Sequence, residues 1–154
     1  MKSLILISLI AFLGCTRNPK SQTSSVENNP DAVVTTFVEL SVASKTAEDK
    51  KKLLNSCGGD LKRAFERMTD DEFKLVYLSG QLKVEKMEIL KTQIQNDTAS
   101  VHYRVSIENK QGTEVTQETN EREAQLRKNT SGWVIEAIRM KGTDKLAFTR
   151  GMMF

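Results

Sequence analysis

The sequence is poor in residues that do chemistry, since it has one histidine, His102, and two cysteines, Cys15 and Cys57. A protein metal site needs several His, Cys, Asp or Glu side chains at ligand spacing. The sequence shows no such set, so we expect no metal and no other cofactor. A nucleophilic cysteine needs a base beside it, whereas Cys57 follows two leucines and precedes a glycine pair. That setting favours a buried thiol at the end of a helix. With no recognisable catalytic set, the chain is predicted not to be an enzyme.

No large excess of one charge is present either, because the formal net charge is +3. The densest basic run, Lys50–Lys52, directly follows Glu48 and Asp49, and no aromatic residue interrupts it. Nucleic-acid-binding surfaces need clustered basic charge, so nucleic acid is excluded as a partner. A phosphate-binding loop is excluded as well, because the glycine pair at 58–59 is not followed by Lys and Ser or Thr.

Long hydrophobic runs are missing apart from residues 4–13. This run is too short for a transmembrane helix, which needs about 20 apolar residues, but it has the length of a signal-peptide core. Lys2 precedes it, the small Gly14 follows it, and the composition becomes polar after Cys15. These features predict that residues 1–14 are a signal peptide and that the mature chain begins at Cys15.

This junction resembles a bacterial lipoprotein precursor, in which the cysteine after the hydrophobic run is lipidated and becomes the new N-terminus. The resemblance implies that Cys15 carries acyl chains such as palmitate, which hold the protein on a membrane of the bacterial cell envelope. Thr16 resembles the residue found after the cysteine in lipoproteins of the outer membrane, where the domain would face the periplasm. The alternative is an ordinary secretory signal with a chance cysteine, which would give a soluble exported protein. Residues 15–28 have no apolar periodicity and are predicted to be a flexible tether.

The first part of the remaining chain, residues 29–154, is predicted to be helical. Asn29 is a plausible N-cap, Pro30 suits the first helical position, and apolar residues follow at helical spacing as far as Leu40. Three further helices are expected, from Thr46 to the glycine pair at 58–59, from Asp60 to about Met68, and from Thr69, which with Glu72 forms a capping box, to Gly80.

After Gly80 the hydrophobic period changes to alternation, which predicts strands at 82–95, 98–109, 114–128 and 133–141. In the first strand, Val84 is out of phase with Met87 and Ile89, and these in turn with Ile94. Such phase changes predict a bulge or a strong bend. Helices first and short-turned strands second predict a single α+β domain, with N-terminal helices packed on one face of a curved four-stranded antiparallel sheet.

The second strand alternates most cleanly. It places Val101, Tyr103, Val105 and Ile107 on one face and His102 on the other. We therefore expect the first four to face the helices. His102 is predicted to lie on the surface and not in a catalytic site. Near the end of the third strand, Ala124 and Leu126 are expected to face inward in the same way.

Three stretches carry a second resemblance: the helix "PDAVVTTFVEL", the strand pair "VEKMEILKTQIQNDTASVHYRV" and the closing strand from Leu126 to Ile135. Together they resemble the NTF2-like, cystatin-like cone fold, and more narrowly bacterial lipoproteins with a DUF4878-type domain. In that fold the sheet curls around the helices and often leaves a cavity. Family members use the cavity as an enzyme site, as a ligand pocket, or not at all, so the fold alone transfers no function.

The resemblance implies a cavity between sheet and helices, and the large inward-facing aromatic residues are its candidate lining: Phe37, Phe65, Tyr77, Tyr103 and Trp133. The apolar tail, residues 145–154, either packs on the domain or engages a partner. The function expected from these features is that of a membrane-anchored envelope lipoprotein. Its domain would bind a small hydrophobic ligand or another envelope protein without catalysis. The alternative is a cavity enzyme that acts on a small hydrophobic substrate.

Overall fold

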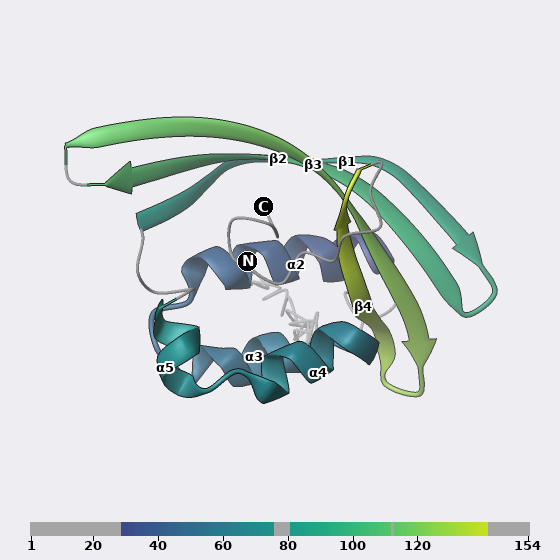
Figure 1. Cartoon of the computed structure of the whole chain (residues 1–154). Coiled ribbons are helices and arrows are strands. Elements are labelled where there is room, and N and C mark those ends of the chain that lie inside the picture. Colours follow the sequence, from purple (N-terminus) through teal and green to yellow (C-terminus); the bar gives the residue numbers. More distant parts are fainter. Residues whose placement is uncertain (1–28, 76–80, 112, 142–154) are drawn as a thin grey trace, which may run out of the picture.

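The fold combines helices and one sheet in the predicted order. The computed structural model describes residues 29–75, 81–111 and 113–141. Within these ranges the elements are α2 (Pro30–Ala43), α3 (Asp49–Asn55), α4 (Gly59–Arg67), α5 (Asp70–Phe73), β1 (Gln81–Gln95), β2 (Thr98–Gln111), β3 (Glu114–Asn129) and β4 (Gly132–Met140). The sheet arches over α2, and α3, α4 and α5 lie beneath that helix (Figure 1). The α+β prediction is therefore confirmed.

The sheet is an antiparallel meander in the order β1-β2-β3-β4, so β1 forms one of its edges. The turn between β1 and β2 is made by Asn96, whose φ of 53° lies in the left-handed region that asparagine tolerates. The pairing of β1 with β2 shifts register between Val84 and Lys86 and again between Ile89 and Lys91. The bulges predicted from the broken hydrophobic phase are thus confirmed.

The helix starts follow the capping signals. The Asn29 side chain accepts a hydrogen bond from the backbone N–H of Asp31 at 3.0 Å. Thr69 and Glu72 form the reciprocal capping box at the start of α5. α3 begins later than predicted, at Asp49, because residues 46–48 form a bend and a turn. The Asp49 carboxylate accepts hydrogen bonds from the N–H groups of Lys45 and Thr46 just before it, at 2.9 and 3.0 Å. Beyond residue 75, the predicted last helix lies outside the described residues.

The core lies between the helices and the inner face of the sheet. On β2, Val101, Tyr103, Val105 and Ile107 are all at most 4% exposed, as the alternation predicts. The helices and the other strands supply further core residues: Val34, Phe37, Val38, Leu53, Leu61, Phe65, Phe73, Ala124, Leu126, Ile135 and Ile138. One apolar core of this kind is what a domain of this size can bury.

A short extended segment between α3 and α4 joins the helices to β4. Ile135 donates its N–H to the Ser56 carbonyl at 2.8 Å, and Gly58 donates its N–H to the Ile135 carbonyl at 2.8 Å. Cys57, between them, is 4% exposed, and its Sγ donates to the Leu53 carbonyl at 3.1 Å. Burial raises the pKa of the Cys57 thiol, so the group is a protonated packing residue. This confirms the prediction of a buried thiol at a helix end.

Candidate functional site

Of the predicted cavity residues, four belong to the core, and Trp133 is the most exposed of them at 6%. Phe37 and Tyr103 are 0% exposed and Phe65 is 2% exposed. The rings of Phe37 and Phe65 meet edge to face, with centroids 6.3 Å apart, so side chains fill the space between these helices. Trp133 lies at a hollow that opens to solvent, whereas Tyr77 and Cys15 lie outside the described residues.

The hollow beside Trp133, called here the Trp133 hollow, is formed where three parts of the fold meet. Its volume is about 440 Å³. α2, the end of α3, and the β3–β4 turn with the start of β4 supply its lining: Val33, Thr36, Asn55, Ser56, Ser131, Trp133 and Val134. Ligand sites of proteins are commonly concave spaces of about 300 to 1,000 Å³ between elements. The Trp133 hollow therefore has the size and the placement of a small-molecule site.

Its surface is apolar at the base and polar at the rim. Val33 is 7% exposed and Trp133 is 6% exposed, so both present only a small face. Asn55 and Ser131 are exposed at the mouth. None of the lining residues is ionisable. The Lys128 ammonium lies 5.9 Å from the centroid of the Trp133 ring, in a cation–π contact.

A second groove, of about 300 Å³, lies near the β1–β2 turn. Glutamine side chains, Gln93, Gln95 and Gln125, make up much of it. Its charged members, Arg127 and Glu136, are engaged with each other, with Nε of Arg127 3.0 Å from Oε1 of Glu136. The groove has two buried apolar residues, Ala99 and Leu126, but its other lining side chains are polar or charged, which leaves the larger Trp133 hollow as the better candidate site.

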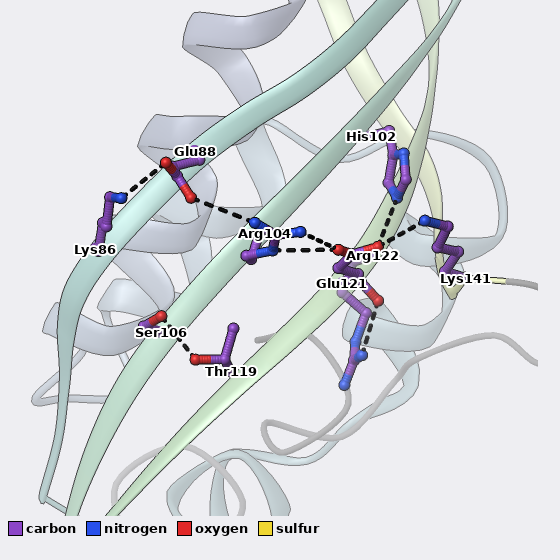
Figure 2. A network of polar contacts seen from close by, with 9 residues as sticks. All are labelled: Lys86, Glu88, His102, Arg104, Ser106, Thr119, Glu121, Arg122 and Lys141. Atoms are coloured by element: carbon purple, nitrogen blue, oxygen red, sulfur yellow. Dashed lines mark hydrogen bonds and ion pairs between the residues drawn. The ribbon is translucent and has the colours of Figure 1, made fainter.

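The outer face of the sheet carries a network of charges centred on Glu121 (Figure 2). Its carboxylate accepts hydrogen bonds from Lys141 Nζ at 2.7 Å and from Arg104 Nη2 at 2.5 Å. Nε2 of His102 lies 3.5 Å from the same carboxylate. His102 thus lies on the sheet face opposite the core, as predicted. Arg104 also reaches Glu88 at 3.8 Å, so the network ties β1 to β2 and β3.

This network makes the stability of the fold depend on pH. Lys141 and then Arg104 lower the pKa of Glu121 from 4.5 to about 2. Because the pKa is lower in the folded state, the ionised Glu121 stabilises the fold above pH 4.5 and loses that contribution as the pH falls towards 2. We expect Glu121→Gln to reduce the urea midpoint at pH 6 but to flatten its fall between pH 4.5 and 2. The side chain is partly solvated, so the effect will be modest.

The matched control is Glu118→Gln, which removes the same charge from an exposed position of β3. It should leave the wild-type pH profile of the urea midpoint in place. Identical profiles for Glu121→Gln and the wild type would contradict the assignment of Glu121 as the centre of the network.

A residue that the sequence reasoning missed is Arg122, which is only 4% exposed. It lies opposite Tyr103 in the β2–β3 register. Nη1 of Arg122 donates to the carbonyl of Glu121 at 3.0 Å. Burial lowers the pKa of Arg122 and raises that of Tyr103. The signal was available, because the alternation that places Ala124 and Leu126 inside also places position 122 inside.

Metal-binding clusters and membrane-spanning helices are both absent from the described part of the chain. No group of three or more His, Cys, Asp or Glu side chains there could hold a metal ion. No helix in that part of the chain is long and apolar enough to cross a membrane.

Comparisons with known proteins give a likeness in fold. No protein-family model and no curated protein sequence matches the chain. The intermembrane space region of the chloroplast protein ARC6 matches with a TM-score of 0.56 and 10% identity, over 71% of this chain and 92% of that one. RPA3114, a SEC-C motif containing protein from Rhodopseudomonas palustris, matches with a TM-score of 0.56 and 10% identity, over 75% and 80%. An NTF2-like protein with a cystatin-like fold from Novosphingobium aromaticivorans gives a TM-score of 0.48 and 9% identity, over 73% and 80%. At such identities these likenesses concern the fold and not the function.

Proposed function

We propose that this chain is a lipid-anchored protein of the bacterial cell envelope, a lipoprotein with a DUF4878-type domain on the outer membrane. Its domain binds a small ligand or a partner protein at the Trp133 hollow and has no catalytic activity. The observation that carries the binding role is the hollow itself, in which an apolar base meets a polar, uncharged rim. Such a surface retains a molecule by apolar contact and orients it by a few hydrogen bonds.

The proposal of a membrane anchor rests on the residues that precede the folded domain. The hydrophobic run ends at Gly14–Cys15, and polar residues lead from there to the N-cap of α2 at Asn29. An acylated Cys15 would therefore hold the domain at the membrane through a segment that precedes all the described elements. Several acyl chains together would make this attachment essentially permanent.

The absence of catalysis is supported by the state of the inner tyrosine. Tyr103 is fully buried in the core and is not part of the lining of the Trp133 hollow. Burial raises the pKa of Tyr103, so the phenol stays protonated and is a poor proton acceptor. A substrate in the hollow would contact neutral side chains, which are weak general acids and bases.

Expression of the full-length chain in a bacterium tests the anchor. We expect the protein in the membrane fraction, with an intact mass that fits cleavage before Cys15 plus acyl chains. Cys15→Ser should abolish the acylation and release the protein from the membrane. Cys57→Ala is the matched control, because it removes the other cysteine and should leave the mass increment of the acyl chains in place. An unmodified Cys15, or cleavage elsewhere, would overturn the anchoring proposal.

A further inference from the structure

The rim of the Trp133 hollow holds polar side chains that the fold does not use. Among the described residues, no hydrogen bond is made by the side chains of Thr36, Asn55, Ser56 or Ser131, although all four line the hollow. They come from α2, from the end of α3 and from the β3–β4 turn. Four such groups from three separate segments converge on one space.

Thr36 is the most informative of them, because hydroxyl groups on a helix usually bond back to the preceding turn. Thr35 does so, with Oγ1 donating to the Asp31 carbonyl at 2.9 Å. Ser41 does so as well, with Oγ donating to the Phe37 carbonyl at 2.8 Å. Thr36, the immediate neighbour of Thr35, makes no such bond and faces the hollow instead. Its hydroxyl is thus available to a bound molecule.

The rim is also held in place before anything binds. The backbone around Ser56 is fixed by the two hydrogen bonds between this segment and Ile135, both at 2.8 Å. Ser131 lies in a tight turn, where its N–H donates to the Asn129 side chain at 2.8 Å. A preformed rim loses little conformational entropy when a ligand engages it.

The chemistry of the lining restricts the occupant. No lining residue is ionisable, and the Lys128 ammonium beside Trp133 is engaged with the indole ring. A charged ligand would therefore lose part of its hydration without a counter-charge in the lining. A purely apolar ligand would cover the rim hydroxyls and the Asn55 amide without hydrogen-bonding them, which also costs free energy. The lining instead fits a molecule with an apolar body against Val33 and Trp133 and with several hydroxyl or amide groups towards the rim.

We propose that the ligand of the Trp133 hollow is an uncharged ring compound with several hydroxyl or amide groups, of the chemical class of a neutral sugar. This inference rests on the proposed binding role and narrows the ligand from an unspecified small molecule or partner protein to a neutral, hydroxylated compound. The C–H face of such a ring packs on the apolar base. Its hydroxyl groups exchange hydrogen bonds with Thr36, Asn55, Ser56 and Ser131.

The chain supplies its own reporter, because Trp133 is the only tryptophan of the sequence. The protein is titrated with N-acetylglucosamine while the fluorescence of Trp133 is recorded, and with glucosamine, glucuronate and 1-octanol as comparison probes. We expect the Trp133 fluorescence to change saturably with N-acetylglucosamine. The binding of glucosamine (cationic), glucuronate (anionic) and 1-octanol (a single hydroxyl) should be at least about tenfold weaker.

Thr36→Val and Thr35→Val form a matched pair, because the same hydroxyl is removed from neighbouring positions of α2. Thr36→Val should weaken the binding of N-acetylglucosamine about five- to tenfold, the effect of one lost hydrogen bond, and Thr35→Val less than twofold. Asn55→Ala provides a second, exposed rim variant, with an effect like that of Thr36→Val.

Saturable binding of 1-octanol alone would overturn the ligand class but keep the hollow as a binding site. Equal effects of Thr36→Val and Thr35→Val on the affinity for N-acetylglucosamine would show that the rim hydroxyl of Thr36 does not contact the ligand. No response to any probe would overturn the ligand class as well. The anchoring proposal would be unaffected, because the mass of the mature protein tests it separately.

Discussion

Phe37→Ala is expected to lower the free energy of unfolding by about 3–5 kcal/mol, the typical cost of deleting a buried phenylalanine ring. Phe37 is 0% exposed and belongs to α2, the helix that lies between the sheet and the lower helices (Figure 1). Its ring also loses the edge-to-face contact with Phe65. The lower helices cannot easily close the resulting cavity, because the Ser56–Gly58 segment fixes them to β4. Urea denaturation followed by far-ultraviolet circular dichroism measures the change.

The control for this variant is Ile94→Ala on β1, because Ile94 is 56% exposed. Removing a large apolar side chain from such a position should cost less than about 1 kcal/mol. A loss for Phe37→Ala no larger than that for Ile94→Ala would contradict the placement of α2 over the sheet.

Gly58→Ala is expected to destabilise the protein by about 1–3 kcal/mol, the usual cost of forcing an extra group into a packed site. A Cβ atom at Gly58 would lie 2.8 Å from Cγ2 of Val134. Val134 is β-branched and has little freedom to turn away. The backbone of Gly58 would have to move, and its hydrogen bond to the Ile135 carbonyl would weaken.

Val134→Ala supplies the matched test, because it removes the clashing Cγ2 and leaves Val134 Cβ at an ordinary 3.4 Å. In that background, Gly58→Ala should cost less than about 0.5 kcal/mol, so the two changes are expected to couple strongly in a double-mutant cycle. Additive costs would show that Gly58 is needed for a reason other than its approach to β4. Urea denaturation of the four proteins gives the coupling free energy.

The parts of the fold that could be predicted are those that depend on neighbours in the chain. The caps at Asn29 and Thr69 involve residues two or three positions apart. The burial of Tyr103 follows from strand alternation. The bulges in β1 are visible as breaks in the hydrophobic phase. In each case the physical cause lies within a few residues, so the pattern of side chains carries it.

The parts that could not be predicted depend on segments that meet only in the folded chain. The Trp133 hollow needs Thr36 and Ser131, which lie on α2 and in the β3–β4 turn. The contact of Gly58 with Val134 joins a loop to a strand far along the chain. Arg122 is a different case, because its inward position followed from the alternation. Arginine is seldom buried, and that general preference concealed the local signal.

The bulges of β1 also bear on how neighbouring copies of the protein behave at high density. A long strand at the edge of a sheet offers unpaired backbone groups to any other extended chain, which is a route to aggregation. β1 has fifteen residues, but its regular course is interrupted at Glu85 and at Leu90. Charged side chains also stand along this strand, where Lys83 pairs with Glu85 at 2.7 Å and Lys86 pairs with Glu88 at 2.8 Å, and hydrated charges of this kind disfavour edge-to-edge pairing. In the anchored state proposed above, molecules on one membrane surface would collide often, and an irregular, charged β1 would keep those collisions from adding strands to the sheet.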